Sequence, residues 1–189
     1  MILGTPRADF IEEAMRLVEA AKARKVVLRV IGALAFSIHC KNFEGLYKAL
    51  GREFSDIDFV GYYKQRSDLE KLFNDAGYIR RQPSMATAFG KRQIYVDTTH
   101  RRIVDVFLDQ LIMCHTIDFR NRLEVDYPTV PLAELLLEKM QIVNLTEKDV
   151  KDTIVLLRAH EVGDKDQETI NSKYIAKLLK DNWGFYYTV

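Results

Sequence analysis

The sequence has little cysteine, no excess of one charge and no histidine pattern typical of a metal site. Only two of its 189 residues are cysteines. Cys40 and Cys114 lie far apart and lack ligand spacing, so neither a disulfide framework nor a cysteine zinc site is indicated. We expect both to be reduced thiols that pack as small apolar groups. The four histidines share no spacing and form no H-E-x-x-H pattern, so each is interpreted as a surface or core residue.

Long apolar runs are also absent from the sequence. No stretch approaches the roughly 20 apolar residues that a membrane helix needs. Asp9, Glu12 and Glu13 occupy the region where a secretion signal would be basic and then apolar, so we expect a cytoplasmic protein with no membrane partner. The 28 basic residues balance 27 acidic ones. This balance argues against broad coating of nucleic acid, and any phosphate binding must be local.

The order of predicted elements indicates the fold class. With 48% hydrophobic residues, the chain is large enough for one core with a small helical appendage. Periodicity predicts helices near residues 5–23, 33–40, 67–76, 131–143, 147–160 and 172–183, and strands near 25–32, 56–61, 92–97 and 102–109. Ser67 with Glu70 predicts a capping box at the third of these helices, and Thr146 is expected to cap the fifth. Residues 41–53 are expected to form a loop or an extra turn. The sequence therefore predicts an α+β fold, with a mixed-sheet core over 1–129 and a C-terminal helical subdomain over 130–189 packed on it.

One pair of acids stands out from the others. Six pairs of acids lie two residues apart, against about four expected by chance, so most of them are ordinary. Only Asp56 and Asp58 lie within an apolar run, between Phe54 and Val60. Alternate side chains of a strand share a face, so the two carboxylates point the same way and repel each other.

A divalent cation would remove this repulsion, because Mg²⁺ prefers carboxylate oxygens and completes its shell with water and phosphate. Such a metal site requires a third acidic residue on a neighbouring strand. Asp105 lies between Val104 and Val106 in a predicted interior strand. Two interpretations stay open at this stage: Asp105 completes a metal site with Mg²⁺ or Mn²⁺, or it forms a salt bridge with a nearby arginine.

The order of these motifs resembles the nucleotidyltransferase superfamily of the DNA polymerase β type. The resemblance rests on "VIGALAFSIH", "GREFSDIDFV" and "RIVDVF", and it is closest to the bacterial AbiEii-like nucleotidyltransferases. In those proteins an Arg and a Ser or Thr precede the paired aspartates, and Arg52 and Ser55 occupy these positions here. The C-terminal helices are similar too, and the matching residues are Glu138, Lys139, Lys148, Asp149 and Asp152.

The resemblance implies roles for particular residues. Asp56 and Asp58 would hold the metal ions, and Asp105 would complete the ion on the nucleophile side. Gly32 would allow close approach of a nucleoside triphosphate. Ala33 departs from the family, in which a Gly or Ser holds the terminal phosphates.

Other implied contacts with the nucleotide have alternatives. The backbone N–H groups at the helix start can still hold an anion, and Ser37 is a partial substitute for the lost hydroxyl. Lys139 either reaches phosphate or extends from a packed stem into solvent. Arg52 either binds phosphate or braces the acidic cluster in the absence of metal, and we favour bracing.

The resemblance implies a Mg²⁺-dependent transfer of NMP from an NTP to a hydroxyl of RNA, a protein or a small molecule. A toxin–antitoxin or defence role, with an antitoxin partner, is implied by the family alone. Ala33 supports an alternative, a non-catalytic module that binds nucleotide or another protein. A further alternative is an interaction protein whose C-terminal helices pack against a second subunit, as in a homo-oligomer. The aromatic run "WGFYY" is expected to pack the last helix onto the body.

Overall fold

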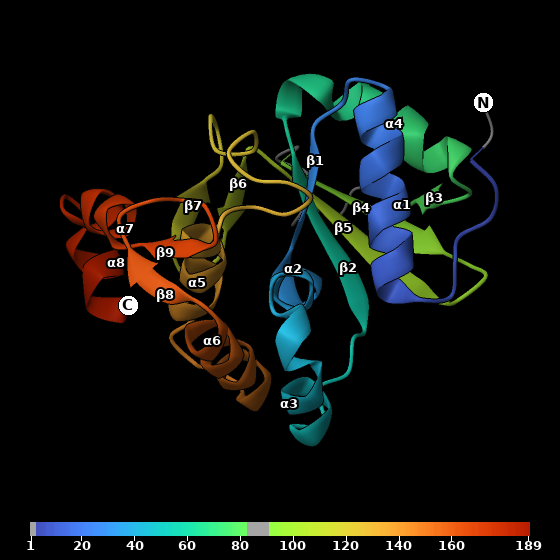
Figure 1. The fold of residues 1–189 in the computed structure, drawn as a ribbon. Helices are drawn as coiled ribbons and strands as arrows, with labels where there is room; N and C mark the ends of the chain where they lie inside the picture. Colours follow the sequence, from blue (N-terminus) through green and yellow to red (C-terminus); the bar gives the residue numbers. More distant parts are fainter. Residues whose placement is uncertain (1–2, 83–90) are drawn as a thin grey trace.

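The structure, a computed structural model, describes residues 3–82 and 91–189. Its first part comprises α1 (Phe10–Ala23), β1 (Leu28–Ile31), α2 (Gly32–His39), η1 (Lys41–Phe43), α3 (Glu44–Ala49), β2 (Asp56–Gly61), η2 (Tyr63–Gln65), α4 (Arg66–Asp75) and β3 (Ile79–Arg80). Its second part comprises β4 (Arg92–Asp97), β5 (Arg102–Leu108), β6 (Gln110–Ile112), β7 (Thr116–Asp118), α5 (Leu132–Met140), α6 (Glu147–Ala159), β8 (Glu161–Gly163), β9 (Thr169–Asn171), α7 (Ser172–Leu179) and α8 (Trp183–Thr188). Figure 1 shows α5 to α8 grouped beside the main sheet.

The main sheet has five strands in the order β1-β2-β5-β4-β3. β2 and β5 are parallel, whereas the other neighbouring pairs are antiparallel. The parallel register sets Asp58 opposite Asp105, and the antiparallel register sets Asp58 opposite Ile31 at the end of β1. The predicted α+β class with a mixed sheet is therefore confirmed.

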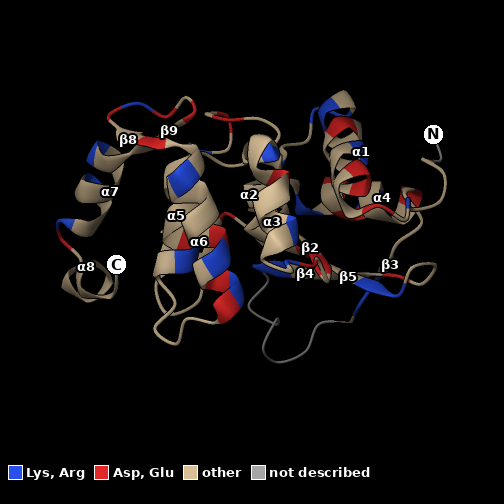
Figure 2. Cartoon of the chain, turned by 60° about the horizontal axis from the view of Figure 1, so that its bottom comes forward, with Lys and Arg blue, Asp and Glu red and all other residues tan. Residues whose placement is uncertain are grey.

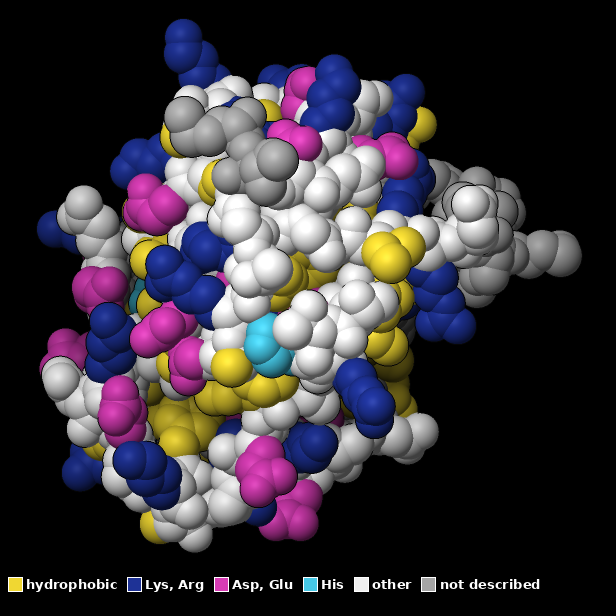
Figure 3. Space-filling view, turned by 90° about the vertical axis from the view of Figure 1, so that its right-hand side faces the viewer, with side chains coloured by type: hydrophobic (Ala, Val, Ile, Leu, Met, Phe, Trp, Pro, Cys, Tyr) yellow, Lys and Arg dark blue, Asp and Glu magenta, His cyan; other side chains and the backbone are white. Residues whose placement is uncertain are grey.

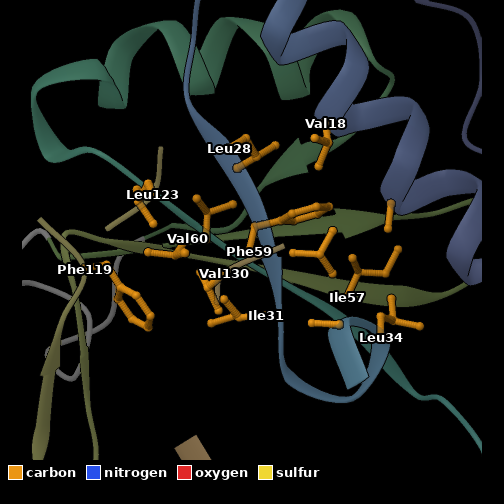
Figure 4. Close-up of a cluster of buried hydrophobic side chains, with 14 of the residues drawn as sticks. Val18, Leu28, Ile31, Leu34, Ile57, Phe59, Val60, Phe119, Leu123 and Val130 are labelled. Atoms are coloured by element: carbon orange, nitrogen blue, oxygen red, sulfur yellow. The ribbon is translucent and has the colours of Figure 1, made fainter. Parts of the chain in front are cut away.

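One face of this sheet forms the hydrophobic core. Ile57 and Phe59 of β2 are fully buried and stand on the opposite face of the strand from Asp56 and Asp58. Figure 4 shows Ile57 and Phe59 near Leu34 of α2 and Val18 of α1. In Figure 2 the helices α1, α2 and α4 lie on one side of the sheet. Burial of one face thus directs the aspartates to the other.

Most predicted helices occur, but two predicted starts are wrong. α1 begins at Phe10 with Asp9 as its N-cap, whose side chain accepts a hydrogen bond from the Glu12 N–H, and not at Thr5. α4 begins at Arg66, so Ser67 lies inside the first turn and does not cap the helix. The predicted cap of α6 is correct: the Thr146 hydroxyl accepts from the Asp149 N–H, and the Asp149 carboxylate accepts from the Thr146 N–H, which together form a capping box.

Two pairs of short strands, one of them in the C-terminal part, were not predicted from periodicity. β8 and β9 form a short parallel ladder, and β6 and β7 form a hairpin. α5 contacts α2, α6, α7 and β9, and the division of the chain at residue 130 stays a prediction. No helix among residues 3–82 and 91–189 has the length and apolarity that a bilayer crossing requires. Acidic and basic side chains are interspersed on the face in Figure 3.

Candidate active site

The three predicted carboxylates lie on one face of the sheet, on adjacent strands. Asp56 and Asp58 come from β2, and Asp105 comes from β5 directly beside Asp58. Asp56 is exposed, Asp58 is partly buried, and the Asp105 side chain is 10% exposed. All three line a cavity of about 280 Å³. The parallel pairing of β2 with β5 therefore brings together acids that lie 47 residues apart in the sequence (105 − 58).

Gly32 joins β1 to α2 and lies against Asp58. Its φ is +63°, and a Cβ placed on it would lie 2.8 Å from Asp58 Oδ2. Glycine alone combines this backbone conformation with such a close approach. The Gly32 N–H donates a hydrogen bond to Glu138 Oε2 at 2.9 Å. Glu138 is a site residue for which the sequence indicated no role.

Glu138 reaches the cavity from α5 and is buried. Its Oε2 accepts from Gly32, whereas Oε1 is buried without a hydrogen-bond partner in the described residues. Burial raises the pKa of Glu138 to about 8, although the Gly32 N–H counteracts part of this effect. Near neutral pH this carboxyl is therefore largely protonated, which limits the negative charge beside Asp58.

Charge repulsion and burial act on Asp58 in the same direction. Burial, followed by the charges of Asp56 and Asp105, raises the pKa of Asp58 to about 7. The nearby cations Arg92 and Lys139 offset only part of this increase. A divalent cation would relieve the repulsion, and carboxylate oxygens are the ligands that Mg²⁺ prefers. The donor set thus fits such an ion.

Arg92 of β4 neutralises the third acid. Its guanidinium donates two hydrogen bonds to Asp105, from Nε at 3.0 Å and from Nη2 at 2.7 Å. Within the described residues, three His, Cys, Asp or Glu ligand atoms come within 4.8 Å of one another only at a different place in the fold. The three aspartates are therefore spaced more widely in this arrangement, with Asp105 turned to Arg92. This contact is a salt bridge between Asp105 and a nearby arginine, which was one of the two interpretations of Asp105 from the sequence.

The two other predicted cations are anchored by acids of α6. Lys139 lines the cavity, and its Nζ lies 3.0 Å from Asp149 and 3.1 Å from Asp152. Burial alone would lower the pKa of Lys139, but these two carboxylates outweigh it and hold the pKa above its ordinary value. Arg52 makes two hydrogen bonds to Asp152, at 2.9 and 3.1 Å. Arg52 thus pairs with Asp152 and not with the paired aspartates.

The cavity gathers some of the predicted site residues and not others. Those that line it are Gly32, Asp56, Asp58, Asp105 and Lys139, whereas Ala33, Ser37, Arg52 and Ser55 are not among its described lining residues. Ser37 is buried in the second turn of α2. Ser55 contacts the site indirectly, through a 3.2 Å hydrogen bond from its hydroxyl to Asp56.

The overall fold has counterparts among solved structures. The antibiotic-resistance factor ANT(2'')-Ia matches in a solution structure at 10% identity, with 92% of this chain and 96% of that chain covered and a TM-score of 0.52. A crystal structure of ANT(2'')-Ia with adenylyl-2''-tobramycin matches at 11% identity, covering 77% and 86%, with a TM-score of 0.50. An antigenic nucleotidyltransferase-like protein from Paracoccidioides brasiliensis matches at 12% identity, covering 97% and 93%, with a TM-score of 0.52.

These similarities show that the chain has the nucleotidyltransferase fold. At 10–12% identity they show the fold alone. No protein-family model matches the sequence, and no curated protein does.

A larger cavity lies elsewhere, among the C-terminal elements. It has a volume of about 670 Å³, and Leu136, Ile175 and Trp183 are among its mainly apolar lining residues. Trp183 is 73% exposed, whereas Phe185 is buried and stacks on His115. The aromatic run therefore packs through Phe185 and leaves Trp183 at the surface. Because the carboxylates line the smaller cavity, we place the candidate chemistry there.

We predict that Gly32→Ala destabilises the protein more than Gly51→Ala. Gly51 has nearly the same φ, +62°, but nothing lies within 4 Å of its Cβ position. Each variant should lose about 1–2 kcal/mol of unfolding free energy, because alanine is strained in a left-handed backbone conformation. In Gly32→Ala the clash with Asp58 should add to this loss. Urea unfolding measures both values. Equal losses would mean that the close approach to Asp58 is unimportant.

We also predict that Asp58→Asn is more stable than the wild type at pH 8 without divalent cations. Because the folded-state pKa of Asp58 is raised to about 7, the wild type loses stability as pH rises from about 4 through 7. A three-unit shift corresponds to about 4 kcal/mol, and access of solvent to the cavity should reduce the gain to about 1–3 kcal/mol. Urea unfolding at pH 4 to 8 measures the difference in unfolding free energy between Asp58→Asn and the wild type. The exposed Asp181→Asn is the control, and a pH-independent difference between Asp58→Asn and wild type would contradict this prediction.

Proposed function

We propose that this chain is a nucleotidyltransferase that moves NMP from an NTP to a hydroxyl acceptor. The observation that carries the proposal is the placement of Asp56 and Asp58 on β2, with Asp105 in register on β5 and Gly32 against Asp58. The shared fold with ANT(2'')-Ia supports it. In this reaction an acceptor oxygen bonds to the α-phosphorus while the bond to pyrophosphate breaks.

Asp56, Asp58 and Asp105 would hold Mg²⁺ or Mn²⁺. When bound, such ions stabilise the attacking and leaving oxygens of the transfer. Asp105 would also accept the proton of the acceptor hydroxyl, which requires that Arg92 release it. Arg92 would then be free to turn towards phosphate, for which a guanidinium is well shaped.

Other residues would shape the nucleotide site. Gly32 lets the backbone lie directly against Asp58, where a Cβ would clash with the carboxylate, and the triphosphate would bind beside this close contact. Lys139 lines the cavity from α5, and its ammonium, which Asp149 and Asp152 hold in place, would supply positive charge near the phosphates. Arg52 would act as a brace between Asp152 and the chain that leads into β2. Ser55 would orient Asp56 through its hydroxyl.

For the acceptor we propose a small hydroxyl compound, not RNA or a protein. ANT(2'')-Ia, which shares the fold, has been solved with adenylyl-2''-tobramycin. A formal net charge of +1 and the interspersed charges in Figure 3 offer no broad basic surface for RNA on that face. Kinship with the AbiEii-like proteins, and with it a toxin–antitoxin role, stays a prediction.

A second candidate is a module that binds nucleotide without transferring it. The bidentate contact of Arg92 with Asp105 favours this alternative, since it satisfies the third acid without any metal. Ala33, which lacks the family's phosphate-binding hydroxyl, is consistent with it. The two candidates differ in whether NTP binding leads to release of pyrophosphate.

The proposal predicts label transfer from an α-labelled NTP to an acceptor in the presence of Mg²⁺ or Mn²⁺. The protein is incubated with each NTP and, separately, with tobramycin, other small hydroxyl compounds, an RNA pool or protein. Asp56→Asn/Asp58→Asn should lower the rate at least about a thousandfold, since the metal ligands are lost, whereas Asp181→Asn should retain it. Transfer that persists in the double variant would exclude these aspartates from the mechanism. An NTP-dependent increase in Tm without transfer would favour the binding module.

The proposal further predicts that Arg92→Gln binds Mn²⁺ more tightly than the wild type. The variant frees Asp105 of its competing cation, and the gain should be about tenfold, equivalent to about 1.4 kcal/mol. Calorimetric titration measures it. Arg80→Gln is the matched control, because Arg80 lies on the neighbouring strand β3 and pairs with Glu70 of α4. Unchanged Mn²⁺ affinity in Arg92→Gln would show that Arg92 does not compete with the ion.

A further inference from the structure

A second polar cluster lies at the opposite end of α2 from the carboxylates. His39 ends α2, His160 is the C-cap of α6, and Glu168 lies between β8 and β9. All three line a cavity of about 290 Å³. The cluster therefore joins a helix of the sheet core to two C-terminal elements, and its residues are up to 129 positions apart in sequence (168 − 39).

The spacing of the three side chains fits a shared cation better than direct hydrogen bonds. Glu168 Oε1 lies 3.8 Å from His39 Nδ1, and Glu168 Oε2 lies 3.7 Å from His160 Nδ1. One ligand atom from each of the three residues lies within 4.8 Å of the others. These gaps exceed hydrogen-bond length but are close to the separation of about 3.4 Å between two ligands of one tetrahedral Zn²⁺.

The surroundings of His39 resemble those of a histidine ligand. Its side chain is 6% exposed. Nε2 lies 2.6 Å from the Thr129 hydroxyl oxygen and 3.5 Å from Asp126 Oδ2. With Nδ1 as a ligand, Nε2 carries the proton and donates it to Thr129. A metal-binding histidine is commonly oriented in this way by its second nitrogen.

His160 lacks the partners that a buried polar ring requires. Its side chain is 8% exposed, and its Nε2 is buried without a hydrogen-bond partner in the described residues. Nδ1 is 3.7 Å from the Glu168 carboxylate, which is too far for a hydrogen bond. Nδ1 is the ring nitrogen that faces Glu168, so a cation in the cavity would bind Nδ1 and give this buried ring a polar partner.

We propose that His39, His160 and Glu168 bind a Zn²⁺ ion at a site separate from the three aspartates. Two imidazoles with one carboxylate and an open position form a common Zn²⁺ ligand set, whereas Mg²⁺ favours oxygen-only sites. The ion ties α2 to α6 and to the loop between β8 and β9. α2 starts at Gly32, which lies against Asp58, and has eight residues. At a rise of 1.5 Å per residue, His39 is therefore roughly 10 Å along the helix from Gly32.

The test is Zn²⁺ binding to the full chain after removal of metals with a chelator. Competition with a chromophoric chelator in excess Mg²⁺ should yield one Zn²⁺ per chain. Saturating Zn²⁺ should raise Tm by roughly 5–10 °C. Co²⁺ in its place should give the visible absorption of a tetrahedral site. Glu168→Gln should bind Zn²⁺ about a hundredfold more weakly and lose this absorption, and His160→Gln should behave likewise.

The controls separate this site from the aspartates and from misfolding. Glu168 is 73% exposed, so Glu168→Gln should retain the metal-free Tm of the wild type. Glu161→Gln, an exposed neighbour in β8, should bind Zn²⁺ normally, as should Asp56→Asn/Asp58→Asn. Wild-type affinity in both Glu168→Gln and His160→Gln would overturn the proposal. So would failure of the wild type to bind Zn²⁺, or loss of the ion only in the aspartate double variant.

Discussion

The repulsion between carboxylates around Asp58 is the constraint on which the site depends. Sheet register places Asp105 beside Asp58, alternation places Asp56 on the same face, and Gly32 closes one side. Such a cluster is stable only when protons or positive charge reduce its field. The chain uses three means at once: the raised pKa of Asp58, the guanidinium of Arg92 on Asp105, and Lys139 at the cavity wall. A bound divalent cation would take the place of the proton on Asp58 and of the Arg92 guanidinium on Asp105.

The network around Lys139 explains why the C-terminal helices belong to the site. Asp152 of α6 is fully buried and accepts from both Arg52 and Lys139. A buried carboxylate needs such partners, because an unpaired charge there would cost several kcal/mol. Arg52 precedes β2, so the network connects α5 and α6 to the strand that carries the paired aspartates. Among the C-terminal residues on which the expected resemblance rested, Lys139 contacts both Asp149 and Asp152.

The sequence correctly predicted those features of the site that a single local pattern determines. Alternation within an apolar strand identified the shared face of Asp56 and Asp58, and the two valines that flank Asp105 indicated an acid on an interior strand. Arg92 was missed because its contact depends on the register of β4 against β5, which composition does not encode. Ser67 was misassigned because α4 starts at Arg66 with Gln65 as its N-cap, two residues earlier than a cap at Ser67 would give. The short strands β8 and β9 are three residues each, too few to show a period.

The cluster of His39, His160 and Glu168 also shows why no metal-ligand motif with histidine could be recognised in the sequence. Ligand motifs such as H-E-x-x-H are readable because one helix turn brings their residues together, whereas His39 and His160 meet only when α2 packs against α6. α2 has Gly32 at one end and His39 at the other, with Leu34, Ala35 and Phe36 buried between them. A short helix packed this tightly moves as a unit, because a close-packed interior transmits displacement. The two clusters therefore share one helix, with Gly32 against Asp58 at its start and His39 at its end.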